Sequence, residues 1–301
     1  MKPLFGITYS PPKMGKTLAM LRAFPSGLFF SLPGGLDCVS WLGLETGNIA
    51  HKTGLTVDEM AAAIKAAGTR YPAIIIDDAS LQFDAEYLRI KKKQPTWQGN
   101  ESFNQKILEL RDVCRDAPVP VFWTMHEQPP REVKKLGENL GKIIKGTVLV
   151  QGWQLPEKLP AMASFVARVV HDDASIGWPR VYSIRPDEEY ITGSRVDFAI
   201  PDQFPLNIGE MLRSVGEEVP RLKGFEWMEN VVETLSARML DNPADIKTVL
   251  KEAADKLKDK VPNQRHIRWA LADSFDRANL KRYQATLLDT FLNNFDKATL
   301  E

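Results

Sequence analysis

The sequence has few cysteines, no net charge and no long apolar run, and each of these excludes a class of protein. Two cysteines in 301 residues cannot build a structural zinc site, and no Cys/His cluster surrounds either of them. So few cysteines suit a reducing compartment. The 39 basic and 39 acidic side chains balance, so bulk charge does not draw the molecule to nucleic acid. Any such affinity must come from a local basic patch.

Segments directed to a membrane are also missing. No apolar stretch reaches the roughly 20 residues that span a bilayer. The N-terminus passes directly into "LFGITY" without the charged-then-apolar pattern of a signal peptide. We therefore expect a soluble, cytoplasmic protein with no membrane partner. The length suffices for one large domain or for a core domain with an appendage.

What the chain does contain is an alternation of strand and helix patterns. The segment "TVDEMAAAIKAAG" predicts a helix, because Thr56 and Glu59 form a capping box and Gly68 ends it. The alternation predicts an α/β fold with a mainly parallel sheet. Later β patterns near 165–200 predict that the sheet ends in antiparallel strands. Buried strands are predicted at residues 4–9, 27–32, 71–80 and 119–126.

The composition changes near residue 218. From Gly224 onward the patterns are helical, with almost no strand signal. We therefore expect a core domain over residues 1–218 and a C-terminal helical accessory domain over residues 219–301. The basic and aromatic residues of this tail favour a packed bundle with a charged face. Alternatively, the tail mediates subunit contacts or binds a protein partner.

The stretch "SPPKMGKT" lies between a predicted strand and a predicted helix, as the phosphate-binding pattern G-x-x-x-x-G-K-[ST] requires. Lys16 would reach the β and γ phosphates, and Thr17 would give its hydroxyl to Mg²⁺. Gly15 lets the backbone pass close to the phosphates, whereas Ser10 replaces the first glycine of the pattern. The residues expected to bind the nucleotide are Ser10, Pro11, Pro12, Lys13, Met14, Gly15, Lys16 and Thr17.

Two further strand ends carry polar side chains. In "AIIIDDAS", Asp77 would hold the Mg²⁺ shell, and Asp78 either orients the attacking water or is a solvated strand-end residue. The interval from Lys16 to Asp77 suits two strands that lie side by side. In "VFWTMHEQ", Thr124 and His126 share one face of a strand. They either sense the γ-phosphate or the water, or form a buried strand end with satisfied polar groups.

With these elements placed, the chain resembles the RecA-like P-loop ATPases, and within them the phage-encoded ATPases of single-strand annealing and recombination. The resemblance rests on "SPPKMGKT", "YPAIIIDDAS", "VPVFWTMHEQ" and "RPDEEYITGSRVDFAIP" and covers residues 3–212. It implies ATP, Mg²⁺, assembly into rings or filaments, and a task on DNA in the cytoplasm of a bacterial host. It also implies that Arg195 completes a neighbouring subunit's site, the alternative being an ordinary surface arginine.

The chain departs from this family at one point. RecA-like ATPases commonly carry a catalytic glutamate at the end of the strand after the first helix. Here that strand is "GLFFSLPGG", which ends without an acid, and Glu45 is the first glutamate after it. Either Asp78 takes the role of the catalytic glutamate, Glu45 folds back to the nucleotide site, or hydrolysis is slow.

Two basic segments are candidates for contacts with single-stranded DNA, because each follows a strand of the nucleotide site. Basic side chains would track phosphates, and Trp97 could stack on a base. The alternative for both segments is a solvated surface loop. The candidate residues are Lys91, Lys92, Lys93, Arg131, Lys134 and Lys135.

The sequence therefore predicts an oligomeric RecA-like ATPase that acts on single-stranded DNA in recombination, repair or replication. A second reading is a motor or loader in replication or DNA packaging. A third is a nucleotide-gated assembly protein with little hydrolysis, which the missing strand-end glutamate favours.

Overall fold

The computed structural model describes residues 4–24, 26–36, 49–132, 143–152, 154–170, 180–185, 187–196 and 203–206, and isolated positions from 208 onward. The chain divides into two compact units, of which the first holds Met1–Leu36, Asn48–Val170 and Arg180–Pro220. All that follows concerns this first unit. The helical domain predicted over 219–301 lies outside the described residues, apart from two isolated positions, and the boundary at 218 stays a prediction.

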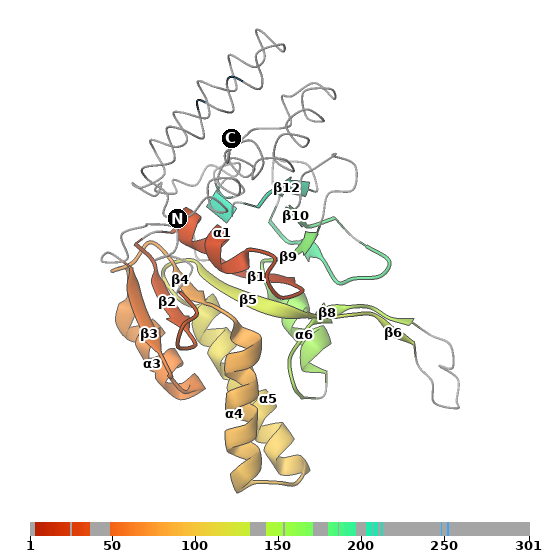
Figure 1. Ribbon diagram of the computed structural model, residues 1–301. Coiled ribbons are helices and arrows are strands. Elements are labelled where there is room, and N and C mark those ends of the chain that lie inside the picture. Colours follow the sequence, from red (N-terminus) through yellow and green to blue (C-terminus); the bar gives the residue numbers. More distant parts are fainter. Residues whose placement is uncertain are drawn as a thin grey trace, which may run out of the picture. The chain divides into compact units, whose positions relative to one another are not determined.

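A mainly parallel sheet forms the centre of this unit, with the strand order β12-β10-β9-β1-β5-β4-β2-β3 (Figure 1). The parallel strands are β1 (Phe5–Ser10), β2 (Leu28–Ser31), β3 (Ala50–Thr53), β4 (Ile74–Ile76), β5 (Val121–Gln128) and β9 (Phe165–Val170). The antiparallel strands are β8 (Thr147–Val148), β10 (Val181–Ser183), β11 (Gly193–Ser194) and β12 (Gln203–Pro205). The α/β class, the mainly parallel sheet and the antiparallel end are thus confirmed.

The strand order corrects one expectation. β1 pairs with β5 and β9, whereas β4 pairs with β2 and β5. The strands that lead to Lys16 and Asp77 are therefore not side by side, because β5 lies between them. The interval between the two motifs is long enough for either arrangement, so it could not decide the order.

Helices cover both faces of the sheet. α1 (Lys16–Ala23) follows β1, and Phe24 at its end stacks on Phe122 of β5 with ring centroids 5.2 Å apart. The other helices pack their apolar residues on the opposite face, in one cluster that includes Ile7, Trp123 and Phe83. No helix in the described part of the chain is both long and apolar enough to cross a bilayer. The helices of the opposite face are α3 (Val57–Ala67), α4 (Ala79–Lys93), α5 (Trp97–Arg115) and α6 (Leu155–Met162).

The start of α3 forms as its sequence predicts. Thr56 Oγ1 accepts a hydrogen bond from the Glu59 N–H at 3.2 Å, and Glu59 Oε2 accepts one from the Thr56 N–H at 2.8 Å. This reciprocal pair satisfies two N–H groups that the first turn of a helix leaves without partners. The predicted capping box is confirmed.

α4 and α5 form a helical hairpin that projects away from the sheet (Figure 1). The turn between them is tight, because a Cβ on Gly99 would lie 2.1 Å from the Gln94 carbonyl oxygen. Lys91 closes the turn by donating hydrogen bonds to the carbonyl oxygens of Pro95 and Thr96, at 2.8 and 2.9 Å. We refer to residues 91–97 as the hairpin tip. Trp97 there is 68% exposed.

Candidate functional site

The loop between β1 and α1 has the conformation that a phosphate-binding loop needs. Lys13 and Gly15 have positive φ angles of 65° and 88°, and Gly15 is the residue that precedes α1. The N–H groups at the start of α1 therefore point out of the sheet at its carboxyl edge, where an anion is favoured. Ser10 ends β1 and is buried, and its hydroxyl donates to the Pro11 carbonyl at 2.8 Å. A small side chain thus fits where the pattern has glycine.

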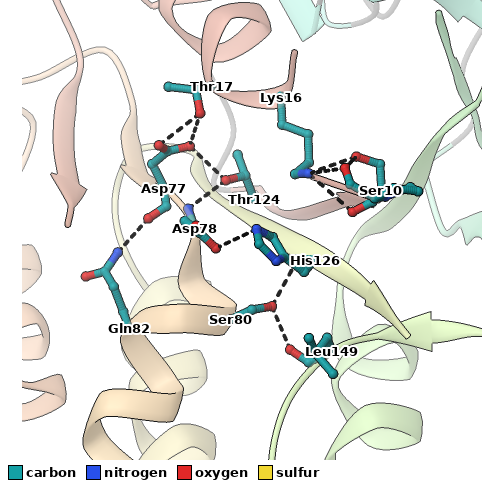
Figure 2. A network of polar contacts seen from close by, with 11 residues as sticks. Ser10, Lys16, Thr17, Asp77, Asp78, Ser80, Gln82, Thr124, His126 and Leu149 are labelled. Atoms are coloured by element: carbon teal, nitrogen blue, oxygen red, sulfur yellow. Dashed lines mark hydrogen bonds and ion pairs between the residues drawn. The ribbon is translucent and has the colours of Figure 1, made fainter. Parts of the chain in front are cut away.

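Lys16 is the central cation of this loop. Its Nζ donates to Ser10 Oγ at 2.8 Å, to the Pro11 carbonyl at 3.1 Å and to the Ser10 carbonyl at 3.3 Å (Figure 2). Burial lowers the pKa of Lys16 to about 8, although the nearby charges of Asp78 and Asp77 act to raise it. The ammonium is therefore desolvated while its direct contacts are neutral oxygens. Such a cation binds phosphate oxygens more strongly than a solvated one.

Thr17 and Asp77 meet across β5. Thr17 Oγ1 donates to the two carboxylate oxygens of Asp77 at 2.9 and 3.0 Å, and Thr124 Oγ1 donates to Asp77 Oδ1 at 2.8 Å (Figure 2). Thr124 belongs to β5, so the intervening strand supplies the side chain that orients the carboxylate. Burial raises the pKa of Asp77 to about 6, and the hydrogen bonds from Thr124 and Thr17 oppose this shift.

This pair of residues fits Mg²⁺. A hydroxyl and a carboxylate are the hard oxygen donors that Mg²⁺ prefers, and the ion usually keeps several waters and substrate phosphates as its other ligands. Within the described residues no group of three or more His, Cys, Asp or Glu side chains gathers into a metal site. An ion held by Thr17 and Asp77 would therefore depend on a phosphate ligand for part of its shell.

Asp78 and His126 form a second pair beside the first. Asp78 caps α4 in a left-handed conformation, with φ 53°, and its N–H donates to Thr124 Oγ1 at 2.8 Å. Its Oδ1 lies 3.1 Å from His126 Nε2. The His126 backbone is fixed in turn, because its N–H donates to Ser80 Oγ at 2.9 Å. For Thr124, the structure agrees with the alternative of a buried strand end whose polar groups are satisfied. His126 and Asp78, by contrast, are only half-buried.

Sequence reasoning missed three side chains at this edge. Gln82 of α4 donates to the carbonyl oxygens of Asp77 at 2.6 Å and Phe30 at 3.2 Å, which ties the ends of β4 and β2 together. Glu127 of β5 pairs with Arg168 of β9, with Oε2 and Nε 2.7 Å apart. Glu127 directly follows His126, so it could have been predicted from the sequence as an acidic residue at a strand end. Arg168 could not, because it lies inside its strand, before Val169 and Val170, and not at a strand end.

The end of β2 carries Ser31 where the RecA-like resemblance would place a glutamate. Ser31 is buried, and its Oγ lies 2.6 Å from His51 Nε2 on the adjacent strand β3. Burial lowers the pKa of His51, which favours its neutral form. Glu45 lies outside the described residues. The departure seen in the sequence thus persists, since in the described part β2 ends on a neutral Ser–His pair.

Arg195 lies at the other edge of the sheet. Its N–H donates to the Ser164 carbonyl at 2.8 Å, and its guanidinium donates to the Ala161 carbonyl. Ser164 directly precedes β9, which runs parallel to β1, so this is the amino edge of the sheet. Arg195 therefore does not reach the loop of its own chain, and its role in a neighbouring subunit stays a prediction.

The first basic segment is placed differently from the expectation. Lys91, Lys92 and Lys93 form the last turn of α4 rather than a loop directly after β4. At 1.5 Å per residue, the 15 residues of α4 put this turn about 20 Å from Asp78. Arg131 is exposed in β6 (Arg131–Glu132), which pairs with β7 (Ile143–Ile144). Lys134 and Lys135 lie outside the described residues.

Comparison with known proteins gives a limited result. No protein-family model matches the sequence, and no curated protein matches it. Among solved structures, the chain is similar to a KaiC-like protein from the hyperthermophilic archaeon Pyrococcus horikoshii OT3, with 15% sequence identity and a TM-score of 0.40. The match covers 64% of this chain and 83% of that chain. At that similarity it assigns no function, which has to come from the site itself.

Proposed function

We propose that this protein binds ATP with Mg²⁺ and hydrolyses it, as a homo-oligomeric RecA-like ATPase that acts on single-stranded DNA. The observation that carries the proposal is the meeting of Thr17 Oγ1 with the Asp77 carboxylate at 2.9 Å, directly beside the buried Lys16. Two residues 60 positions apart in the sequence converge on the loop, and their chemistry is that of a metal–nucleotide site. This convergence supports a nucleotide site independently of the short sequence motif.

Each side chain has a distinct task in the proposed reaction. Lys16 neutralises the charge on the outer phosphates, and Mg²⁺, when bound by Thr17 and Asp77, would neutralise more of it. Asp78 lies at the carboxyl edge with its carboxylate held toward His126, so it can orient a water molecule and accept its proton. The Thr124 hydroxyl forms hydrogen bonds with both the Asp77 carboxylate and the Asp78 N–H. It therefore holds the proposed metal ligand, Asp77, and the proposed base, Asp78, in a fixed position relative to each other.

Assembly into a ring or filament is part of the proposal. Arg195 lies at the amino edge of the sheet, away from the loop of its own chain. A head-to-tail arrangement would bring it to the carboxyl edge of the next subunit, where a guanidinium would neutralise developing phosphate charge. ATP binding would then tighten the subunit contact, and hydrolysis would release it.

The proposed polymer is single-stranded DNA, bound in part at the hairpin tip. Lys92 and Lys93 are exposed there, and the exposed Trp97 ring follows within four residues. Basic side chains next to an exposed aromatic ring can hold phosphates and stack a base. The task would be recombination, repair or replication in the cytoplasm of a bacterial host, as the resemblance to phage-encoded annealing ATPases implies. A replication or packaging motor would use the same core.

A second candidate function is a nucleotide-gated assembly protein that hydrolyses little ATP. The observation that favours it is the end of β2, where the neutral pair of Ser31 and His51 replaces a strand-end glutamate. In that case Asp78 would stabilise the bound nucleotide complex rather than act as an efficient base.

One experiment separates these functions. ATP turnover is measured with and without single-stranded DNA for the natural protein and for Lys16→Ala. DNA-stimulated turnover that disappears in Lys16→Ala supports the proposed ATPase. Tight ATP binding without turnover under either condition would contradict it and support the assembly protein. Failure of the natural protein to bind ATP would contradict both.

A further inference from the structure

Arg180 reaches the phosphate-binding loop from a strand that the sequence does not connect with it. It directly precedes β10, and because β10 is antiparallel to β9, Val181 lies beside Val170 at the end of β9. β9 runs parallel to β1. The beginning of β10 therefore lies at the same carboxyl edge of the sheet as the loop.

The guanidinium of Arg180 lies against the loop backbone. Its Nη1 donates to the Lys13 carbonyl at 3.4 Å. A Cβ placed on Gly15 would lie 3.1 Å from Nη1 and 3.7 Å from Cζ of the same guanidinium, and 3.1 Å from Cδ2 of Leu206. Arg180 and Leu206 thus flank the residue that opens α1. Any side chain at Gly15 would press on the arginine as well as require an unfavourable φ of 88°.

The charge of Arg180 has no counterion within the described residues. Arg168 of the neighbouring strand β9, by contrast, is paired with Glu127. Among the described residues, the hydrogen-bond acceptor of the Arg180 guanidinium is the Lys13 carbonyl at 3.4 Å, near the outer limit for a hydrogen bond. Arg180 is half-buried, and burial lowers its pKa, so its surroundings disfavour the charge. An accompanying anion would offset the cost of partly burying this cation.

We propose that Arg180 is a second phosphate-binding cation of the nucleotide site, acting within its own chain. The inference rests on the nucleotide binding proposed above and adds a residue to it. Lys16 would hold the phosphates from inside the loop, and the guanidinium of Arg180 would hold them from the side of β10. The guanidinium presents several N–H donors in one plane, and two phosphate oxygens can accept from them at once. A single carbonyl oxygen leaves part of this donor set unused. The ligand class is a nucleoside di- or triphosphate.

The test is isothermal titration calorimetry of ATP with Mg²⁺ on the full chain. Arg180→Met keeps most of the apolar contact and removes the charge, and we expect ATP affinity to fall about 10- to 100-fold. Arg180→Gln, which keeps hydrogen-bonding capacity without charge, should lose affinity similarly, and Arg180→Lys should recover part of it. Arg185→Met is the matched control, because Arg185 is exposed beyond the other end of β10. Its ATP affinity should equal that of the natural protein.

A second probe, tripolyphosphate, separates a phosphate contact from a contact with the base or the fold. If Arg180 binds phosphates, Arg180→Met and Arg180→Gln lower the affinity for tripolyphosphate by the same factor as the affinity for ATP. The inference is overturned if both variants bind ATP as the natural protein does, or if ATP binding weakens while tripolyphosphate binding does not. If the natural protein binds neither ligand, the proposed nucleotide site itself is wrong.

Discussion

Two cationic regions in the described part of the chain differ in how their charges are held. At the loop between β1 and α1, where we propose that phosphates bind, Lys16 is buried and Arg180 is half-buried, and both lie against backbone carbonyls. At the hairpin tip, about 20 Å of helix away from Asp78, Lys92 and Lys93 are exposed to solvent. The first region fixes a few charges in one geometry. The second leaves the charges of Lys92 and Lys93 in contact with solvent.

This difference implies different ligands. Fixed, desolvated cations bind a small anion whose shape matches them, and salt screens them weakly. Solvated cations bind a polyanion by releasing its counterions, so their affinity depends strongly on salt and little on sequence. The four predictions below test this comparison, from the largest expected effect to the smallest.

Lys16→Met should abolish the function of the loop. The substitution removes the buried charge that we propose to hold the phosphates, and we expect ATP affinity to fall about 100-fold or more. Equilibrium binding of ATP with Mg²⁺, followed by calorimetry, measures the change. Lys65→Met is the control, because Lys65 is an exposed lysine on α3 that is not part of the proposed site. Equal losses in the two variants would contradict a distinct role for the buried lysine.

Asp77→Asn should uncouple ATP binding from Mg²⁺. The amide keeps the shape of the carboxylate and one acceptor for Thr17 or Thr124, but it removes the charge that would hold the metal shell. We expect Mg²⁺-dependent turnover to fall about 10- to 100-fold, while ATP binding in excess chelator changes little. A turnover rate like that of the natural protein would show that Asp77 does not hold the metal.

The double substitution Lys92→Glu and Lys93→Glu should weaken binding of single-stranded DNA about 10-fold and make its salt dependence shallower. Two lost phosphate contacts correspond to a change of about 1.4 in the slope of log affinity against log salt. Fluorescence anisotropy of a labelled oligonucleotide over a series of salt concentrations measures both. Lys65→Glu with Arg70→Glu, at exposed positions in and just beyond α3, is the charge-matched control. If the control weakens binding as much, the tip has no special role.

Ser10→Gly should have the smallest effect. It restores the usual loop pattern but removes the hydroxyl that accepts a hydrogen bond from Lys16. Two backbone carbonyls still hold Lys16, so we expect ATP affinity to change by less than about 3-fold, equivalent to less than one hydrogen bond. Calorimetry as above provides the value. A large loss would mean that the serine hydroxyl itself positions the lysine.

The sequence predicted the elements that a short stretch of neighbouring residues is enough to identify. The apolar runs that became β1, β2, β4 and β5 were evident, and so were the capping box at Thr56 and the loop that ends at Thr17. These features depend on neighbouring residues alone. The edge strand β3 was missed, because its sequence "AHKT" is short and partly polar and its side chains are mostly exposed. α4 was missed too, because its first residues continue the strand motif that contains Asp78.

The arrangement between elements was beyond the reach of the sequence. Nothing local shows that β5 lies between β1 and β4, or that Thr124 thereby becomes the link between Thr17 and Asp77. Arg180 is the clearest case, because only the antiparallel direction of β10 brings the start of that strand to the carboxyl edge. A residue's place along a strand does not reveal which edge of the sheet it reaches until the direction of the strand is known.

The most direct test of the two-region account is a crossed measurement on three proteins: the natural chain, Lys16→Met, and the double variant Lys92→Glu with Lys93→Glu. The affinity for ATP with Mg²⁺ is measured without DNA, and the affinity for single-stranded DNA is measured without nucleotide. The account predicts that the Lys16 variant loses ATP binding and keeps DNA binding, and that the hairpin-tip variant does the opposite. Loss of both ligands in either variant, with the fold intact by circular dichroism, would contradict it.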